Sequence, residues 1–138
     1  MYPEHLVAPL REDLKDVGFV ELKTPEDVIG QLEDQKGTTL LVINSVCGCA
    51  AGSARPGVKI AITNASKKPD HLTTVFAGVD MEATSKAREF TAPYPPSSPS
   101  IALFKDGELI HFVERHHIEG NPASVIGDHL VEVFEEYC

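Results

Sequence analysis

The chain has 138 residues and is acidic, with 21 Asp and Glu residues against 12 Lys and Arg residues and a formal net charge of −9. This charge excludes the basic footprint of a nucleic-acid-binding protein, and no apolar run reaches the roughly 20 residues that span a bilayer. The N-terminus, "MYPEHLVAPLREDL", has none of the features of an export signal. We therefore expect one domain over residues 1–138, located in the cytoplasm and in contact with neither nucleic acid nor membrane.

The first two helices are predicted from periodicity and capping residues. Residues 3–16 place Leu6, Leu10 and Leu14 four positions apart, which predicts an amphipathic helix, and "GFVEL" follows as a short strand. Residues 24–37 begin with a helix-start signal, Thr24 followed by Pro25. We expect this second helix to stop at Gly37 and to bury the following apolar residues: Val28, Ile29 and Leu32.

The middle of the chain alternates buried strands with helices. "TTLLVIN" at 38–44 is a nearly continuous apolar run, typical of a strand that is buried on both faces. Residues 49–64 are rich in alanine with helical spacing, although Pro56 should bend this helix or interrupt its hydrogen bonds. "HLTTVFAGV" predicts another buried strand, and Asp80 is expected to cap a helix over 81–90.

The last third predicts a β-hairpin and a closing helix. "SIALFKDGELIHFVE" contains two strands around Asp106-Gly107, a strong hairpin signal. Asn121 and Pro122 open the last helix, whose expected buried positions are Val125, Ile126, Leu130, Val133, Phe134 and Tyr137. Strands that are joined through helices lie parallel, whereas a hairpin is antiparallel. The order therefore predicts an α/β protein with a central mixed sheet and helices on both faces.

The two cysteines of "NSVCGCAAGSARPG", residues 44–57, follow the predicted central strand directly. Ligands of α/β sheets bind beyond the carboxyl ends of the strands, and a helix N-terminus favours a thiolate over a thiol. We therefore expect Cys47 to be the accessible nucleophile and Cys49 to resolve a mixed disulfide on Cys47. Gly48 and the small residues after it leave room for a partner sulfur.

Two other interpretations of the cysteine pair remain open. Both cysteines can be buried simply as small apolar residues. A zinc site would need four ligands, so His116, His117 or Cys138 would have to join the pair. We expect no metal at the site.

Three segments give the chain a family resemblance. "VCGCAAGSARPG", together with "MYPEHL" at the start and "RHHIEG" near the end, resembles the bacilliredoxin family, and the element order resembles the thioredoxin fold with an extra N-terminal helix. The resemblance covers nearly the whole chain. In thioredoxin-like proteins a strand commonly begins at a cis-proline that faces the redox cysteines. "SSPSIALFKDGE" matches this feature, which implies a cis bond before Pro99 and a substrate-binding role for Gly48, Ser98 and Pro99.

The resemblance implies a thiol–disulfide oxidoreductase that removes bacillithiol, a low-molecular-weight bacterial thiol, from mixed disulfides on client proteins. Bacillithiol would be a co-substrate, with no bound cofactor. A disulfide isomerase or weak reductase acting on proteins is one alternative, and a metal-binding or redox-sensing module is another. The one-residue spacer between the cysteines closes a small ring, so we expect an easily reduced disulfide. "LLVINSV" also lacks an acidic proton acceptor, which argues against an efficient general reductase.

Four further residues are noted without an assigned role. His116 and His117 follow the last strand and would bind carboxylates of bacillithiol or carry a proton, or serve only as surface residues. Arg55 would support the thiolate or lie on a solvated helix face. Cys138 would be an accessory resolving thiol or an uninvolved terminal cysteine.

Overall fold

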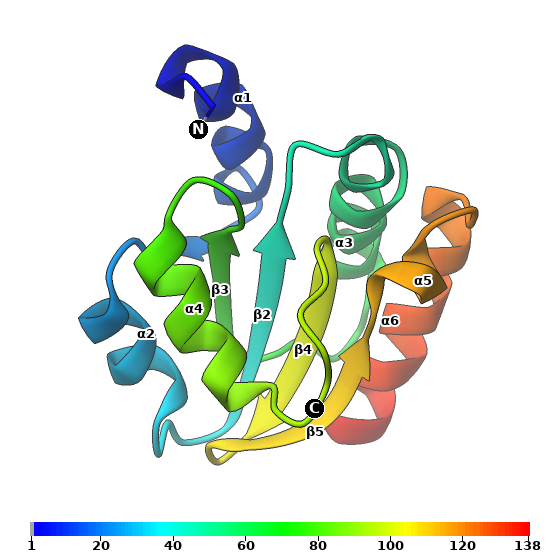
Figure 1. Cartoon of the computed structure of the whole chain (residues 1–138). Coiled ribbons are helices and arrows are strands. Elements are labelled where there is room, and N and C mark those ends of the chain that lie inside the picture. The colour runs from blue at the N-terminus through cyan, green and yellow to red at the C-terminus, as the bar shows by residue number, and fades with distance from the viewer. Residues whose placement is uncertain (1) are drawn as a thin grey trace.

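The computed structural model describes residues 2–138 as a five-stranded mixed sheet with helices on both faces (Figure 1). Its elements are α1 (Glu4–Lys15), β1 (Val20–Glu21), α2 (Pro25–Leu32), β2 (Thr38–Asn44), a π-helical turn η1 (Ala50–Ala54), α3 (Arg55–Asn64), β3 (His71–Phe76), α4 (Met81–Phe90), β4 (Ser100–Lys105), β5 (Glu108–Val113), α5 (Arg115–Ile118) and α6 (Ala123–Tyr137). The strand order is β1-β3-β2-β4-β5. Within the described residues, no helix is long and apolar enough to cross a membrane.

Strand β2 lies at the centre of the sheet and is buried along its whole length. It pairs in parallel with β3 and antiparallel with β4. Side chains alternate between the two faces of a strand, and the apolar run of β2 supplies both faces. Leu40 and Val42 join one core, while Leu41 and Ile43 join the other.

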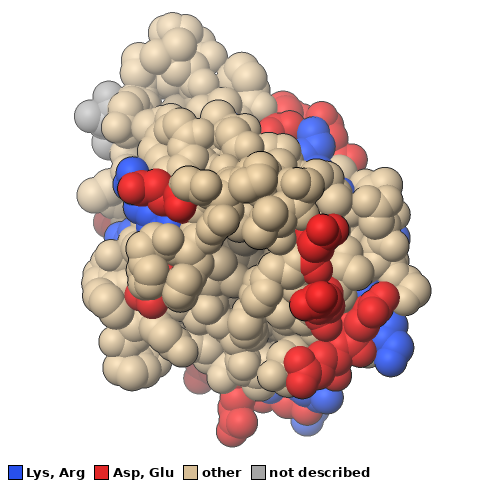
Figure 2. All heavy atoms as spheres, turned by 90° about the vertical axis from the view of Figure 1, so that its right-hand side faces the viewer, with Lys and Arg blue, Asp and Glu red and all other residues tan. Residues whose placement is uncertain are grey.

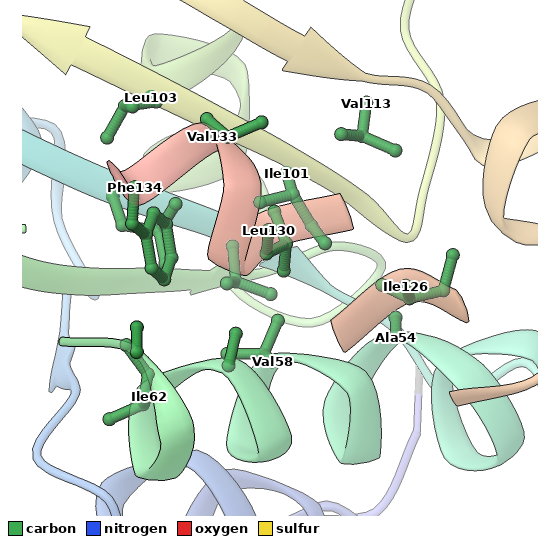
Figure 3. Close-up of a cluster of buried hydrophobic side chains, with 14 of the residues drawn as sticks. Ala54, Val58, Ile62, Ile101, Leu103, Val113, Ile126, Leu130, Val133 and Phe134 are labelled. Carbon is green, nitrogen blue, oxygen red and sulfur yellow. The ribbon is translucent and has the colours of Figure 1, made fainter. Parts of the chain in front are cut away.

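The first core lies between the sheet and helices α3 and α6 (Figure 3). Figure 3 shows Val58 of α3 on the side of the helix that faces Leu130 of α6. The two helices approach closely because glycines lie at their contact. A Cβ atom on Gly57 would come 2.7 Å from Ile126, and one on Gly127 would come 2.7 Å from Ile60. The second core is formed by α2, α4 and the opposite face of the sheet.

Three residues that the sequence assigned to buried helix faces are exposed. Leu6, Ile29 and Val125 are 57%, 37% and 48% exposed. Each lies just outside the stripe that its helix buries: Val7 and Leu14 in α1, Val28 and Leu32 in α2, and Ile126, Leu130, Val133 and Phe134 in α6. These narrow stripes follow helical spacing because each helix contacts the core along one line only.

One predicted helix end and one predicted cap were wrong, whereas the bounds predicted for α4 are confirmed. Helix α2 ends at Leu32, and Gly37 instead serves the turn into β2, where its backbone has a φ of 80° and exchanges hydrogen bonds with Asp106. Asp80 precedes α4 but makes no capping bond. Its carboxylate binds the guanidinium of Arg11 at 2.7 and 3.1 Å, so a long-range ion pair takes the place of the local cap.

Other local predictions are confirmed. Thr24 accepts a hydrogen bond from the backbone N–H of Asp27 and caps α2. Asp106 and Gly107 both have positive φ in the tight β4–β5 turn. The helix that follows the cysteines is irregular, as Pro56 led us to expect, because it begins as the π-helical turn η1 and becomes α-helical at Arg55.

The close contact of α3 and α6 predicts that alanine at Gly57 destabilises the fold, whereas alanine at a glycine with open space around it does not. Gly57→Ala should lower the free energy of unfolding by about 1–3 kcal/mol, because the new methyl group overpacks against Ile126. Gly30→Ala is the matched control: Gly30 lies inside α2 with open space at its Cβ position, so this change should raise stability by about 0.5–1 kcal/mol. Urea unfolding of both variants would measure the difference, and equal effects would contradict the close packing.

Candidate functional site

The two neighbouring cysteines lie directly beyond the carboxyl end of β2. Both thiols are free and half-buried, and Gly48 between them is exposed. The backbone N–H of Cys47 donates to the Ser45 hydroxyl at 3.1 Å, and its carbonyl accepts from Ala50 at 3.0 Å. The first turn of the irregular helix therefore holds the segment at the sheet edge, where the sequence predicted the site.

The pKa of the Cys47 thiol lies below its ordinary value. Burial raises this pKa, but hydrogen bonds from the Cys49 thiol and from the backbone N–H groups of Ala50 and Cys49 lower it. The positive charge of Arg115 lowers it further. Because donors converge on its sulfur, Cys47 is the thiol that carries the negative charge more readily.

The pKa of the Cys49 thiol is shifted in the opposite direction. Burial raises it, and so do the hydrogen bond that Cys49 donates to Cys47 and the negative charge on that sulfur. Arg115 lowers it only in part. When the pair loses a first proton, Cys47 therefore loses it more readily, while Cys49 keeps its own.

Arg115 is the functional residue that sequence reasoning missed. It opens the short helix α5 after β5, is exposed, and is held by two contacts: its Nε donates to Glu119 at 2.9 Å and its Nη1 to the carbonyl of Ser98 at 3.3 Å. "RHHIEG" contains this arginine, but no residue next to it indicates that it reaches the cysteines. Because β4 is antiparallel to both β2 and β5, the last residues of β2 and β5 lie at the same end of the sheet.

The peptide bond between Ser98 and Pro99 is cis, as the resemblance implied. The bond between Ala92 and Pro93 is also cis, which was not predicted. Arg115 joins Ser98 to the site, since one guanidinium contacts the Ser98 carbonyl and acts electrostatically on both thiols. A direct contact of Pro99 with Cys47 and the substrate-binding roles of Gly48, Ser98 and Pro99 stay predictions.

Arg55 lies buried beneath the motif and not on a solvated face. Its Nη1 donates to the side-chain oxygen of Asn44 at 2.9 Å and to the carbonyl of Ser45 at 2.8 Å, while Nε pairs with Asp13 at 3.2 Å. Asn44 in turn accepts from the backbone N–H of Ser45 and donates to Leu10. This network ties α1 and α3 to the end of β2, so Arg55 positions the loop that carries Cys47.

Cys138 lies at the opposite edge of the sheet. Its thiol is within hydrogen-bonding reach of Thr38, the first residue of β2. Cys47, by contrast, follows Asn44, the last residue of β2. A strand of this length spans roughly 20 Å. Cys138 therefore cannot resolve a disulfide on Cys47 within one molecule.

The histidines after β5 do not complete a zinc site with the cysteines. Across residues 2–138, the one group of three potential metal ligands whose atoms lie within 4.8 Å of one another is Glu114, His116 and His117, and it includes neither cysteine. His117 also accepts from the backbone N–H of Glu114 at 3.4 Å and stabilises the start of α5. It lines a cavity of about 350 Å³ with His111 and His129, between β5 and α6.

Comparison with known proteins places this geometry in a family. The family model described as "Disulphide isomerase" matches residues 2–138. A bacilliredoxin of Cytophaga hutchinsonii is 62% identical, over 99% of both chains. The chain belongs to the bacilliredoxin family. Another bacilliredoxin, from Halalkalibacterium halodurans, is 52% identical over 99% of this chain and 94% of its own.

Solved structures confirm the thioredoxin fold of this bacilliredoxin-family chain. A putative oxidoreductase with a thioredoxin fold matches with a TM-score of 0.59 at 15% identity, covering 82% of this chain and 92% of its own. Thioredoxin of Malassezia sympodialis matches with a TM-score of 0.58 at 18% identity, over 87% and 90% of the two chains. Family and fold together identify a thiol–disulfide oxidoreductase.

The hydrogen bond between the thiols predicts how Cys47 responds to replacement of Cys49. Cys49→Ala removes the hydrogen bond to Cys47 and should raise the pKa of Cys47, whereas Cys49→Ser keeps a donor and should raise it less. Alkylation rates of Cys47 against pH, read by mass spectrometry, would measure both values. In the wild type, Cys47 should be labelled before Cys49 at neutral pH, and the reverse order would contradict the assignment.

The position of Arg115 predicts a second effect on the same thiol. Arg115→Gln removes the positive charge and should raise the pKa of Cys47, so that less thiolate is present at neutral pH and alkylation slows. Arg115→Lys keeps the charge and is the matched control. Equal alkylation profiles for Arg115→Gln and wild type would show that this guanidinium does not act on the site.

Proposed function

We propose that this protein removes bacillithiol from mixed disulfides on client proteins, with Cys47 as the attacking thiol and Cys49 as the resolving thiol. The observation that carries the proposal is the opposite shift of the two pKa values: Cys47 is lowered and Cys49 is raised. A thiol that attacks at neutral pH benefits from a lowered pKa, and one that acts later benefits from staying protonated. Family membership supports the chemistry.

In the first step, the thiolate of Cys47 attacks the bacillithiol sulfur of the mixed disulfide. A bond forms between Cys47 and bacillithiol, the original disulfide bond breaks, and the client leaves as a thiolate that takes up a proton. Attack requires an accessible sulfur, and Cys47 is half-buried at the sheet edge beside the exposed Gly48. The Cys49 and backbone donors stabilise the attacking thiolate.

In the second step, Cys49 or a second bacillithiol releases the adduct. The negative charge on Cys47 disappears once its sulfur is bound in a disulfide, and this removes one of the causes that raise the pKa of Cys49. Cys49 can then lose its proton and attack Cys47, which expels bacillithiol as a thiolate and leaves a Cys47–Cys49 disulfide. The exchange needs no bound cofactor because sulfur atoms carry the electrons. It suits the reducing cytoplasm, where such disulfides are transient.

Single cysteine variants test the assigned order. Cys47→Ser should abolish removal of bacillithiol from a modified client, because a hydroxyl does not replace the thiolate. Cys49→Ser should still attack and should accumulate a bacillithiol adduct on Cys47, visible by mass spectrometry and reversed by added thiol. Cys138→Ser is the control and should behave as wild type, since Cys138 lies at the far edge of the sheet.

Two outcomes would contradict this mechanism. Activity in Cys47→Ser combined with loss of activity and no adduct in Cys49→Ser would reverse the two roles. Full activity in both variants would overturn thiol exchange at this site.

Disulfide isomerisation in protein substrates is a second candidate, favoured by the description of the matching family model. An isomerase also needs a nucleophilic thiolate, but it acts without bacillithiol. Recovery of activity from a scrambled, disulfide-bonded protein in the absence of bacillithiol would support it. Dependence on bacillithiol would favour the first proposal.

A further inference from the structure

A cavity of about 320 Å³ lies between α4 and the segment that returns from α4 to β4. Figure 1 shows this segment, which contains Pro96, running beside α4 on one side of the sheet. The lining residues are Gly78, Met81, Thr84, Ser85, Arg88 and Pro96. None of them belongs to the cysteine site described above.

Thr84 lines this cavity, and its hydroxyl has no hydrogen-bond partner among the described residues. Thr84 is 2% exposed, and its Oγ1 is buried. A buried hydroxyl that has lost its hydrogen bonds to water and has no partner in the protein destabilises the fold, so such groups are rare in folded proteins. An incoming acceptor would satisfy it.

Arg88 is unpaired in the same cavity. Its Nε is buried and has no partner within residues 2–138, and no carboxylate there forms an ion pair with it. The chain has four arginines, and the other three differ: Arg11, Arg55 and Arg115 each pair with an acidic side chain. In a chain of net charge −9, a half-buried guanidinium without a carboxylate is an exception that a ligand would explain.

Burial alone shifts the titration of this group. The pKa of Arg88 is lowered by burial, the direction expected where no negative charge compensates the desolvated cation. Thr84 and Arg88 are four positions apart on α4, so both side chains lie on the same helix face. Both residues line the same cavity, and each has a buried polar atom without a partner in the described part of the chain.

We propose that this cavity binds a small oxyanion, a carboxylate or a phosphate, with Arg88 as its counter-charge and Thr84 as a hydrogen-bond donor. A guanidinium presents paired N–H donors that match both groups. Met81 and Pro96 offer apolar surface to a short carbon chain. The site is separate from the thiol chemistry and does not depend on it.

The cavity borders the sheet edge on which the cysteines lie. Gly78 comes shortly after Phe76, the last residue of β3, which pairs with Asn44 at the end of β2. Pro96 precedes the cis bond at Pro99 along the same segment. A molecule that occupies the cavity therefore lies next to the cysteine site, on the side where β3 and α4 are.

The test titrates the full chain with inorganic phosphate and, separately, with malonate, at an ionic strength held constant with sodium chloride. Binding is followed by backbone amide NMR shifts and by the rise in Tm that a ligand of the folded state causes. We expect saturable shifts at Gly78, Thr84 and Arg88. The two probes distinguish a phosphate site from a carboxylate site, and either result supports the proposal.

Variants decide whether Arg88 carries the binding. Arg88→Gln should weaken it about tenfold or more, whereas Lys86→Gln removes the same charge from the same helix outside the cavity and should change it little. Thr84→Val should weaken anion binding several-fold while the unliganded protein keeps or gains stability, because an unsatisfied hydroxyl is replaced by a methyl group. The proposal is overturned if neither anion gives saturable shifts, or if Arg88→Gln and Lys86→Gln respond alike. Thr84→Val decides the case if Arg88→Gln does not fold.

Discussion

The burial of β2 on both faces is the constraint on which the rest of the structure depends. Leu40 and Val42 pack under α3 and α6, while Leu41 and Ile43 pack under α2 and α4. A strand held from both sides cannot shift its register without moving apolar side chains out of both cores. The carboxyl end of β2 is therefore firmly positioned, and the two cysteines follow it directly.

The loop beyond β2 is held by charge and hydrogen bonds, since the apolar run ends at Asn44. Arg55 reaches back from α3 to Asn44 and Ser45, and Asp13 of α1 balances its charge. A buried guanidinium is stable only because each of its contacts is an acceptor. The extra N-terminal helix thus contributes an acid to the support of the redox loop. The exposed side of α6 is acidic, and Figure 2 shows acidic side chains gathered on that side of the molecule.

The asymmetry between the thiols comes from their surroundings, because two cysteines one residue apart are chemically alike. Cys47 receives hydrogen bonds from the Cys49 thiol and the backbone, and Cys49 donates the bond that Cys47 receives. Arg115 adds a positive charge from a distant part of the chain. The two thiols therefore differ in how readily they lose a proton, and this difference suits two different roles in a thiol exchange.

Local patterns in the sequence determined the elements and the place of the cysteines. The apolar run at 38–44, the Thr24 cap and the Asp106-Gly107 turn depend on neighbouring residues, and each was predictable for that reason. Only the tertiary structure decided contacts between distant segments: the pairing of Asp80 with Arg11, the burial of Arg55, the distance of Cys138 from the site and the arrival of Arg115 beside the thiols. The residues next to a charged side chain in the sequence are the same whether that side chain contacts solvent, a carboxylate or a thiolate in the folded protein. Its partner is chosen by how the strands pair and the helices pack, and those long-range contacts leave no mark in the residues next to it.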